Sequence, residues 1–134
     1  MSDLAALGVT AQRQFLTVDG VELTELVFAL PRTTGVEATF SAEGFADKLL
    51  KIFKKEIQAG DPLFDEHVHI KTDTTDATAA LLVSSDLRAI IERVITSGGA
   101  IEIDGSRLKM EIPGRHEAHD EFVTLFVRTL LGHG

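Results

Sequence analysis

Two Asp-Gly pairs, each set between apolar runs, constrain the fold of this chain more than any other feature. The first pair, Asp19-Gly20, divides residues 14–30, QFLTVDGVELTELVFAL. Both central residues of a type I′ turn need positive φ, so an Asp-Gly pair between such runs predicts a tight hairpin. With a two-residue loop, the expected cross-strand neighbours are Val18 with Val21 and Leu16 with Leu23.

The second pair, Asp104-Gly105, repeats this pattern within residues 100–112, AIEIDGSRLKMEI. Two hairpins predict a largely antiparallel sheet whose apolar face is covered by helices. Alternation places Ile101, Ile103, Leu108, Met110 and Ile112 on one face of this hairpin, and Glu102, Arg107, Lys109 and Glu111 on the other.

Two more segments alternate apolar and polar residues and are expected to be strands. They are residues 36–40, VEATF, and 64–71, FDEHVHIK. In the second segment the side that carries Phe64, Val68 and Ile70 is expected to be buried.

Helical spacing of apolar residues predicts four helices. They are residues 45–57, two helices that follow N-cap residues at 73–76 and 84–86, and a last helix from about 116 to 131. The predicted core stripes are Leu87, Ile90, Ile91, Val94 and Ile95, which end at Gly98-Gly99, and then Phe122, Leu125, Phe126 and Leu130.

The predicted order, β-β-β-α-β-α-α-β-β-α, indicates a two-layer α+β fold. With 134 residues the chain has the size of one domain. Residues 1–12 are expected to be flexible or to form a short helix.

Composition excludes several classes of function. The chain has no cysteine, so thiolate metal sites and cysteine nucleophiles are excluded. Its formal net charge of -8 and its lack of Tyr and Trp disfavour nucleic-acid binding. The start of the chain is not typical of a secretory signal and no apolar run is long enough to span a bilayer, so we expect a soluble, cytoplasmic protein.

Residues 60–112 resemble uncharacterised bacterial proteins of the domain-of-unknown-function type. The segment Gly60-Asp61-Pro62 followed by Phe64-Asp65 is the first part of the resemblance, and the rest consists of Leu81, Leu82 and Leu87, then Ile101, Ile103, Asp104, Gly105 and Leu108. Some members of this group carry membrane helices upstream. The resemblance supports the fold and implies no catalytic residue.

The spacing of the histidines is the sequence feature that most strongly suggests a metal site. His67 and His69 would project from one face of a strand, and His116 and His119 would be neighbours on a helix. With Asp65, Glu117 or Asp120 these histidines could form a zinc or iron site. The alternative, which we favour, is that all four are solvated surface residues. The segment HEAHD is one residue short of the His-Glu-x-x-His motif and does not predict a protease.

No other pattern indicates catalysis. The acidic clusters that could supply a general acid and base are Glu22 with Glu25, Asp61 with Asp65, and Glu117 with Asp120 and Glu121. Ser84 and Ser85 lack a nucleophile-elbow motif, and the glycine pairs lack a phosphate-loop motif. The sequence therefore indicates neither an enzyme nor a cofactor.

A lysine face on the helix at 45–57 is the one basic region predicted on this acidic chain. It comprises Lys48, Lys51, Lys54 and Lys55. Such a face is usually solvated, although it would also allow contact with an acidic partner, with RNA, or a weak, salt-sensitive contact with an anionic membrane.

Three hypotheses of function follow. The leading one is a non-enzymatic domain that contacts another protein or a second copy of itself, through the surroundings of Phe40, Phe45 and Phe53 or through the last helix. The second is a small-molecule or lipid pocket between sheet and helices, lined by Phe15, Phe28, Phe64, Phe122 and Phe126. The third is metal-dependent activity at His67, His69, His116 and His119.

Overall fold

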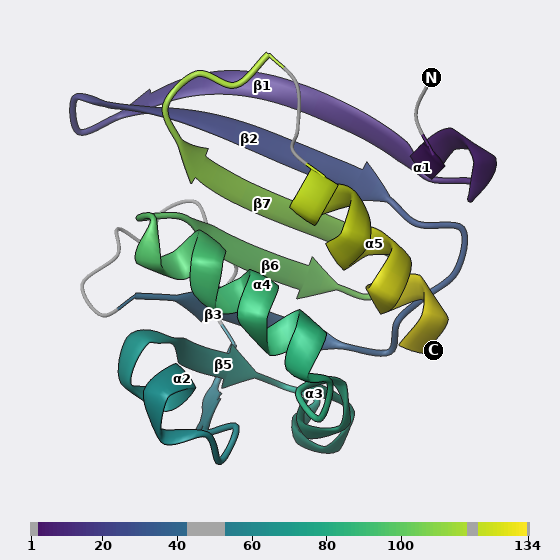
Figure 1. Ribbon diagram of the computed structural model, residues 1–134, viewed down its shortest axis with the longest axis vertical. Helices are drawn as coiled ribbons and strands as arrows, with labels where there is room; N and C mark the ends of the chain where they lie inside the picture. The colour runs from purple at the N-terminus through teal and green to yellow at the C-terminus, as the bar shows by residue number, and fades with distance from the viewer. Residues whose placement is uncertain (1–2, 43–52, 118–120, 134) are drawn as a thin grey trace.

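The computed structural model describes residues 3–42, 53–117 and 121–133. It consists of a mainly antiparallel sheet with helices packed against it (Figure 1). Within these residues the strands are β1 (Thr10–Val18), β2 (Val21–Ala29), β3 (Glu37–Ser41), β4 (Lys55–Ile57), β5 (His69–Thr72), β6 (Ala100–Asp104) and β7 (Arg107–Pro113). The helices are α1 (Asp3–Ala6), α2 (Pro62–His67), α3 (Thr75–Leu81), α4 (Ser85–Thr96) and α5 (Glu121–His133). The predicted α+β class is confirmed.

The strands lie in the order β1-β2-β7-β6-β3-β5-β4, and each neighbouring pair is antiparallel. The two predicted hairpins therefore lie side by side, joined where β2 pairs with β7 (Figure 1). The pairing of β2 with β7 joins segments about 80 residues apart in the sequence, so no local sequence pattern predicts it.

The first hairpin has the predicted turn and register. Asp19 and Gly20 have φ of 51° and 79°, as a type I′ turn requires. Val18 pairs with Val21 and Leu16 with Leu23.

The second hairpin forms with the predicted apolar and charged faces, but its loop is shifted by one residue from the predicted tip. Asp104 pairs with Arg107, so the loop is Gly105-Ser106, not Asp104-Gly105. Gly105 has φ of 65° and occupies the glycine position of a type II′ turn. Ile101 still faces Met110, and Ile103 faces Leu108.

Helices α4 and α5 cover one side of the sheet, which we call the helix face (Figure 1). All five predicted apolar residues of α4 are buried there. Ser84 caps the start of α4, and the N–H groups of Gly98 and Gly99 bond to the carbonyls of Ile95 and Val94. This is the Schellman arrangement, in which Gly98 has φ of 101°, so the predicted glycine terminator is confirmed.

Helix α5 begins at Glu121, later than the predicted start near residue 116. Phe126 and Leu130 are buried as predicted, whereas Leu125 is 47% exposed, so its assignment to the core stripe was wrong. Val123, Val127 and Leu131 complete the buried stripe. The side chain of Phe122 lies outside the described residues.

The predicted helix at 45–57 is wrong where it can be compared, because Lys55–Ile57 is the edge strand β4. Residues 43–52 lie outside the described part of the chain, and Phe45, Lys48 and Lys51 with them. Phe40 and Phe53 are 0% and 4% exposed, so they do not form the surface predicted for partner contact.

The predicted strand at 64–71 is wrong in its first half, which forms helix α2. Asp61 caps this helix and Pro62 occupies its first turn, and together these residues outweigh the alternating pattern. Phe64, Val68 and Ile70 are nevertheless all buried. The cap of α3 is Thr74, and Asp73 instead accepts the N–H of Lys54 at 3.0 Å.

Candidate functional site

Charged residues occupy the side of the sheet opposite the helix face. Glu102, Lys109 and Glu111 alternate along β6 and β7 with the apolar core residues, as the sequence predicts. However, their exposed fractions are 3%, 9% and 0%, so this charged face is not a solvated surface at its centre.

Glu25 of β2 lies directly opposite Glu111 of β7. The bonds from the Gly114 N–H to the Glu22 carbonyl and from the Leu30 N–H to the Ser106 carbonyl identify the even-numbered residues of β2 as the ones bonded to β7. Glu25 and Glu111 are therefore a non-hydrogen-bonded pair, the kind whose side chains lie closest. Like charges in such a pair repel.

Two cations of β7 contact a third carboxylate, that of Glu102. Lys109 Nζ lies 3.7 Å from Glu102 Oε1, and Arg107 Nη1 lies 3.4 Å from Glu102 Oε2. Neither carboxylate oxygen of Glu111 accepts a hydrogen bond from a donor among the described residues, whereas a protonated Glu111 can share a side-chain hydrogen bond with Glu25. Glu111 is thus a buried acid that lies directly opposite a second acid, Glu25.

The pKa of Glu111 reflects this environment. Burial raises it from the ordinary value of 4.5 to about 7. The charge of Glu25, a side-chain hydrogen bond with Glu25 and the charge of Glu102 add to the rise, and Lys109 opposes it. The carboxyl group therefore gains or loses its proton near neutral pH.

Two open grooves flank β1, one on each side of the sheet. A groove of about 400 Å³ on the charged face is lined by Gln12, Arg13, Gln14, Glu25 and Val27. The second, of about 490 Å³, lies near α1 and is lined by Leu4, Ala5, Val9, Leu26 and residues 10–13. Glu25 thus lies at the wall of a groove and in contact range of Glu111.

Strand β1 forms one edge of the sheet (Figure 1). Its pairing with β2 runs from Thr10 to Val18 without a bulge. Because the turn makes Val18 and Val21 a hydrogen-bonded pair, even-numbered residues of β1 bond to β2 and odd-numbered residues direct their backbone groups outward. Within the described residues no strand pairs with this outer edge.

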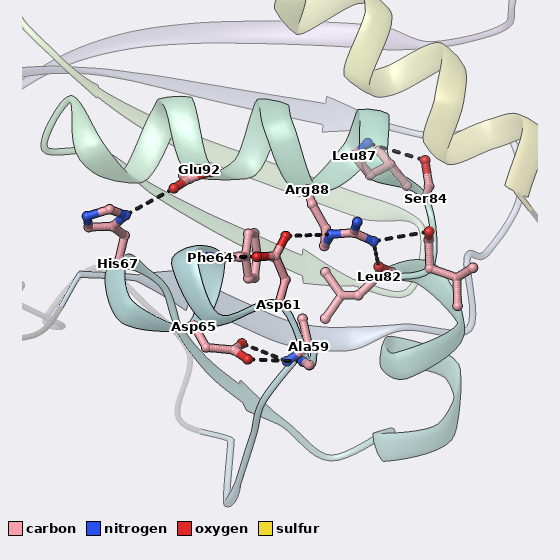
Figure 2. A network of polar contacts seen from close by, with 12 residues as sticks. Ala59, Asp61, Phe64, Asp65, His67, Leu82, Ser84, Leu87, Arg88 and Glu92 are labelled. Carbon is pink, nitrogen blue, oxygen red and sulfur yellow. Dashed lines mark hydrogen bonds and ion pairs between the residues drawn. The ribbon is translucent and has the colours of Figure 1, made fainter.

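The Gly60-to-Asp65 segment has a structural role, shown in Figure 2. Asp61 caps α2 and lies 3.5 Å from Arg88 Nε, while Arg88 Nη1 donates to the carbonyl of Leu82 at 2.6 Å. Asp65 accepts the N–H groups of Ala59 and Gly60 at 2.7 and 3.0 Å. This predicted acidic pair therefore anchors α2 to the preceding loop and to α4.

Replacing Asp65 with alanine is expected to lower the free energy of unfolding by about 1.5 to 3 kcal/mol, because two backbone N–H groups lose a charged acceptor. Urea unfolding at pH 7 measures this effect. The control is Glu66→Ala, an exposed position in the same helix, where a change within about 0.5 kcal/mol is expected. Equal losses in the two variants would contradict the anchoring role.

The predicted histidine pair is not formed, because His67 ends α2 whereas His69 begins β5. His67 Nδ1 lies 3.0 Å from Glu92 (Figure 2), and His69 Nδ1 lies 3.4 Å from Glu56. The ring Nε2 of His116 contacts the carbonyl of Pro113 at 2.7 Å. His119 lies outside the described residues, as does Asp120.

No group of three or more potential ligands within residues 3–42, 53–117 and 121–133 could hold a metal ion. Glu117 contacts Arg115 at 3.2 Å, and Glu25 faces Glu111 rather than Glu22. The side chain of Glu121 is not among those described.

The phenylalanines predicted to line a pocket are mostly packed in the core. Phe28, Phe64 and Phe126 are 0%, 1% and 0% exposed and belong to one apolar cluster. Phe15 is half-buried beneath the Arg115 guanidinium, 3.8 Å from its ring centre. None of them lines either groove beside β1.

The Glu25–Glu111 pair was not predicted from the sequence. The alternation of the second hairpin places Glu111 opposite the core, which normally means contact with solvent. Only the pairing of β2 with β7 reveals its acidic neighbour, and no local motif carries that information.

No protein-family model matches this chain, and no curated protein or solved structure does so either. None of the helices in the described part of the chain is long and apolar enough to cross a membrane.

Proposed function

We propose that this chain is a non-enzymatic interaction domain that binds a protein partner by accepting an extended segment as an additional strand beside β1. The observation that carries the proposal is the outer edge of β1, nine residues long and free of bulges. The outward N–H and C=O groups of Ala11, Phe15 and Thr17 would bond to the incoming segment.

The two edges of the sheet differ in a way that supports this choice. Proteins usually protect edge strands by making them short or by placing charged residues or proline on them. Strand β4 fits that description, with three residues that include Lys55 and Glu56. Strand β1 is three times as long and contains no proline and a single charged residue, Arg13.

The grooves beside β1 add a means of recognition. Side chains of an extended segment point alternately to the two faces of a sheet. One set would enter the groove on the charged face and the other set would enter the groove near α1. Strand addition of this kind draws affinity from the backbone and specificity from such pockets.

The other hypotheses have less support. The residues proposed for a small-molecule or lipid pocket include three core phenylalanines, whose packing leaves them no room to contact a ligand. The histidines proposed for a metal are separated, and each described one has its own partner.

Hydrogen exchange tests the proposal directly. In the isolated domain, the amides of Ala11, Phe15 and Thr17 are expected to exchange fast, whereas those of Gln12, Gln14 and Leu16 are protected by β2. A bound partner strand should protect the first set. If partner binding leaves these amides unprotected, β1 is not the binding edge.

Substitution of Thr17 by proline supplies the matched test. Proline removes one outward N–H without removing a bond to β2, so partner affinity is expected to fall about ten-fold while the fold is retained. Thr17→Ser keeps the N–H and should bind like the wild type. Equal affinity of the two variants would contradict strand addition at this position.

A further inference from the structure

We propose that the segment accepted by β1 is basic, and that a Lys or Arg side chain from it enters the charged-face groove and pairs with Glu25 beside Glu111. This inference rests on the proposed function and specifies its partner. The partner is thus an extended protein segment with a cation on one face.

The geometry of the sheet places such a cation correctly. Gln14, Glu25 and Glu111 form one row across β1, β2 and β7 on the charged face. An added strand would lie about 4.8 Å outside β1, so its side chain in this row would have only Gln14 between it and Glu25. The groove of about 400 Å³ occupies this region and has Glu25 in its wall. The long stem of Lys or Arg can lie along such a groove.

Glu111 provides the second, independent observation. It is 0% exposed, and neither of its carboxylate oxygens accepts a hydrogen bond from a donor among the described residues. A buried charge is costly unless it is paired. An added positive charge at Glu25 would oppose the repulsion between Glu25 and Glu111, which face each other where β2 pairs with β7.

A second copy of the chain fits this site poorly. The residues that β1 itself presents on the charged face are Thr10, Gln12, Gln14, Leu16 and Val18, none of which is a cation. Two chains of formal net charge -8 also repel each other. Arg13 also lines this groove but alternates onto the helix face, so a basic segment of another protein adds a cation beside Glu25 that β1 of a second copy would not supply.

Binding of the cation is coupled to the protonation of Glu111. The groups that face this carboxyl are Glu25 on β2, Glu102 on β6 and Lys109 on β7. An added cation would lower the pKa of Glu111, so the complex holds fewer protons than the free domain. Affinity for a basic segment should therefore rise with pH across the range below and around 7.

Two fluorescent nine-residue peptides test the inference by anisotropy titration. Both alternate Thr and Val, and they differ only at the centre, which is Lys in one and norleucine in the other. At pH 8 the Lys peptide is expected to bind about ten-fold more tightly, with a smaller preference at pH 5.5. Glu25→Gln should abolish the preference for the Lys peptide. Glu22→Gln, an exposed acid on the same strand, should retain it.

The outcomes separate this inference from the proposed function. Equal binding of both peptides, with protection of the Ala11, Phe15 and Thr17 amides, would overturn the basic preference and keep strand addition. Absence of binding and of protection for both peptides would overturn strand addition itself. A dimer in light scattering whose β1 amides are protected would assign the edge to a second copy and overturn the basic partner.

Discussion

Replacing Gly99 with alanine is expected to lower the free energy of unfolding by about 3 kcal/mol or more. The Cβ of alanine would lie 3.0 Å from Val94 Cγ1 and 3.1 Å from the Val94 carbonyl oxygen, and closer still to the carbonyl oxygen of Glu111. Two of these atoms belong to backbone that cannot move without disturbing the end of α4 or the pairing of β6 with β7. Urea unfolding monitored by circular dichroism measures the loss.

The matched control is Gly132→Ala in α5. Among the described residues, no atom beyond its chain neighbours and the nearby backbone of its own helix lies within 4 Å of a Cβ added at Gly132. Alanine is favoured over glycine in helices, so this variant is expected to gain up to about 1 kcal/mol. If Gly99→Ala and Gly132→Ala have the same stability, the close approach of Gly99 to Glu111 does not constrain the fold.

Replacing Glu111 with glutamine is expected to stabilise the domain at pH 8 and to have little effect at pH 4.5. In the wild type, the pKa of this carboxyl is raised from 4.5 to about 7 in the folded state. Between these values the folded state binds more protons than the unfolded state, so stability falls as pH rises. The full effect above pH 7 corresponds to about 3 kcal/mol. Glutamine cannot ionise and avoids this loss.

Urea unfolding of both proteins at several pH values between 4.5 and 8 measures the difference. Glu22→Gln is the control, because Glu22 is exposed on the same sheet and its replacement should leave the pH dependence unchanged. A wild type and Glu111→Gln variant with parallel pH profiles would show that Glu111 ionises normally in the folded protein.

The error at residues 62–67 shows how two local signals can compete. Alternation of Phe64, Val68 and Ile70 predicted a strand, while Asp61-Pro62 is a typical helix start. The cap bonds of Asp61 and the anchoring bonds of Asp65 favour the helix. A greater weight on the Asp-Pro pair would have predicted α2 and would have separated His67 from His69.

The site was predicted less well than the fold, because its residues come together through non-local pairing. Glu25 belongs to the first hairpin and Glu111 to the second, and each alone is an ordinary polar residue of an amphipathic strand. Their repulsion and the raised pKa of Glu111 arise only when β2 pairs with β7.

The sequence by itself determined the local elements whose signals are contained within a few residues. Positive φ at Asp19, Gly20 and Gly105 turns the two hairpins, and the glycine pair after α4 ends that helix. The tertiary structure alone decided which strand lies at the edge and which charges are buried. Strand order depends on the packing of the whole sheet against α4 and α5, and burial of a carboxylate depends on neighbours far away in the chain. For that reason the outer edge of β1 and the buried acid Glu111, opposite Glu25, became visible only in the folded molecule.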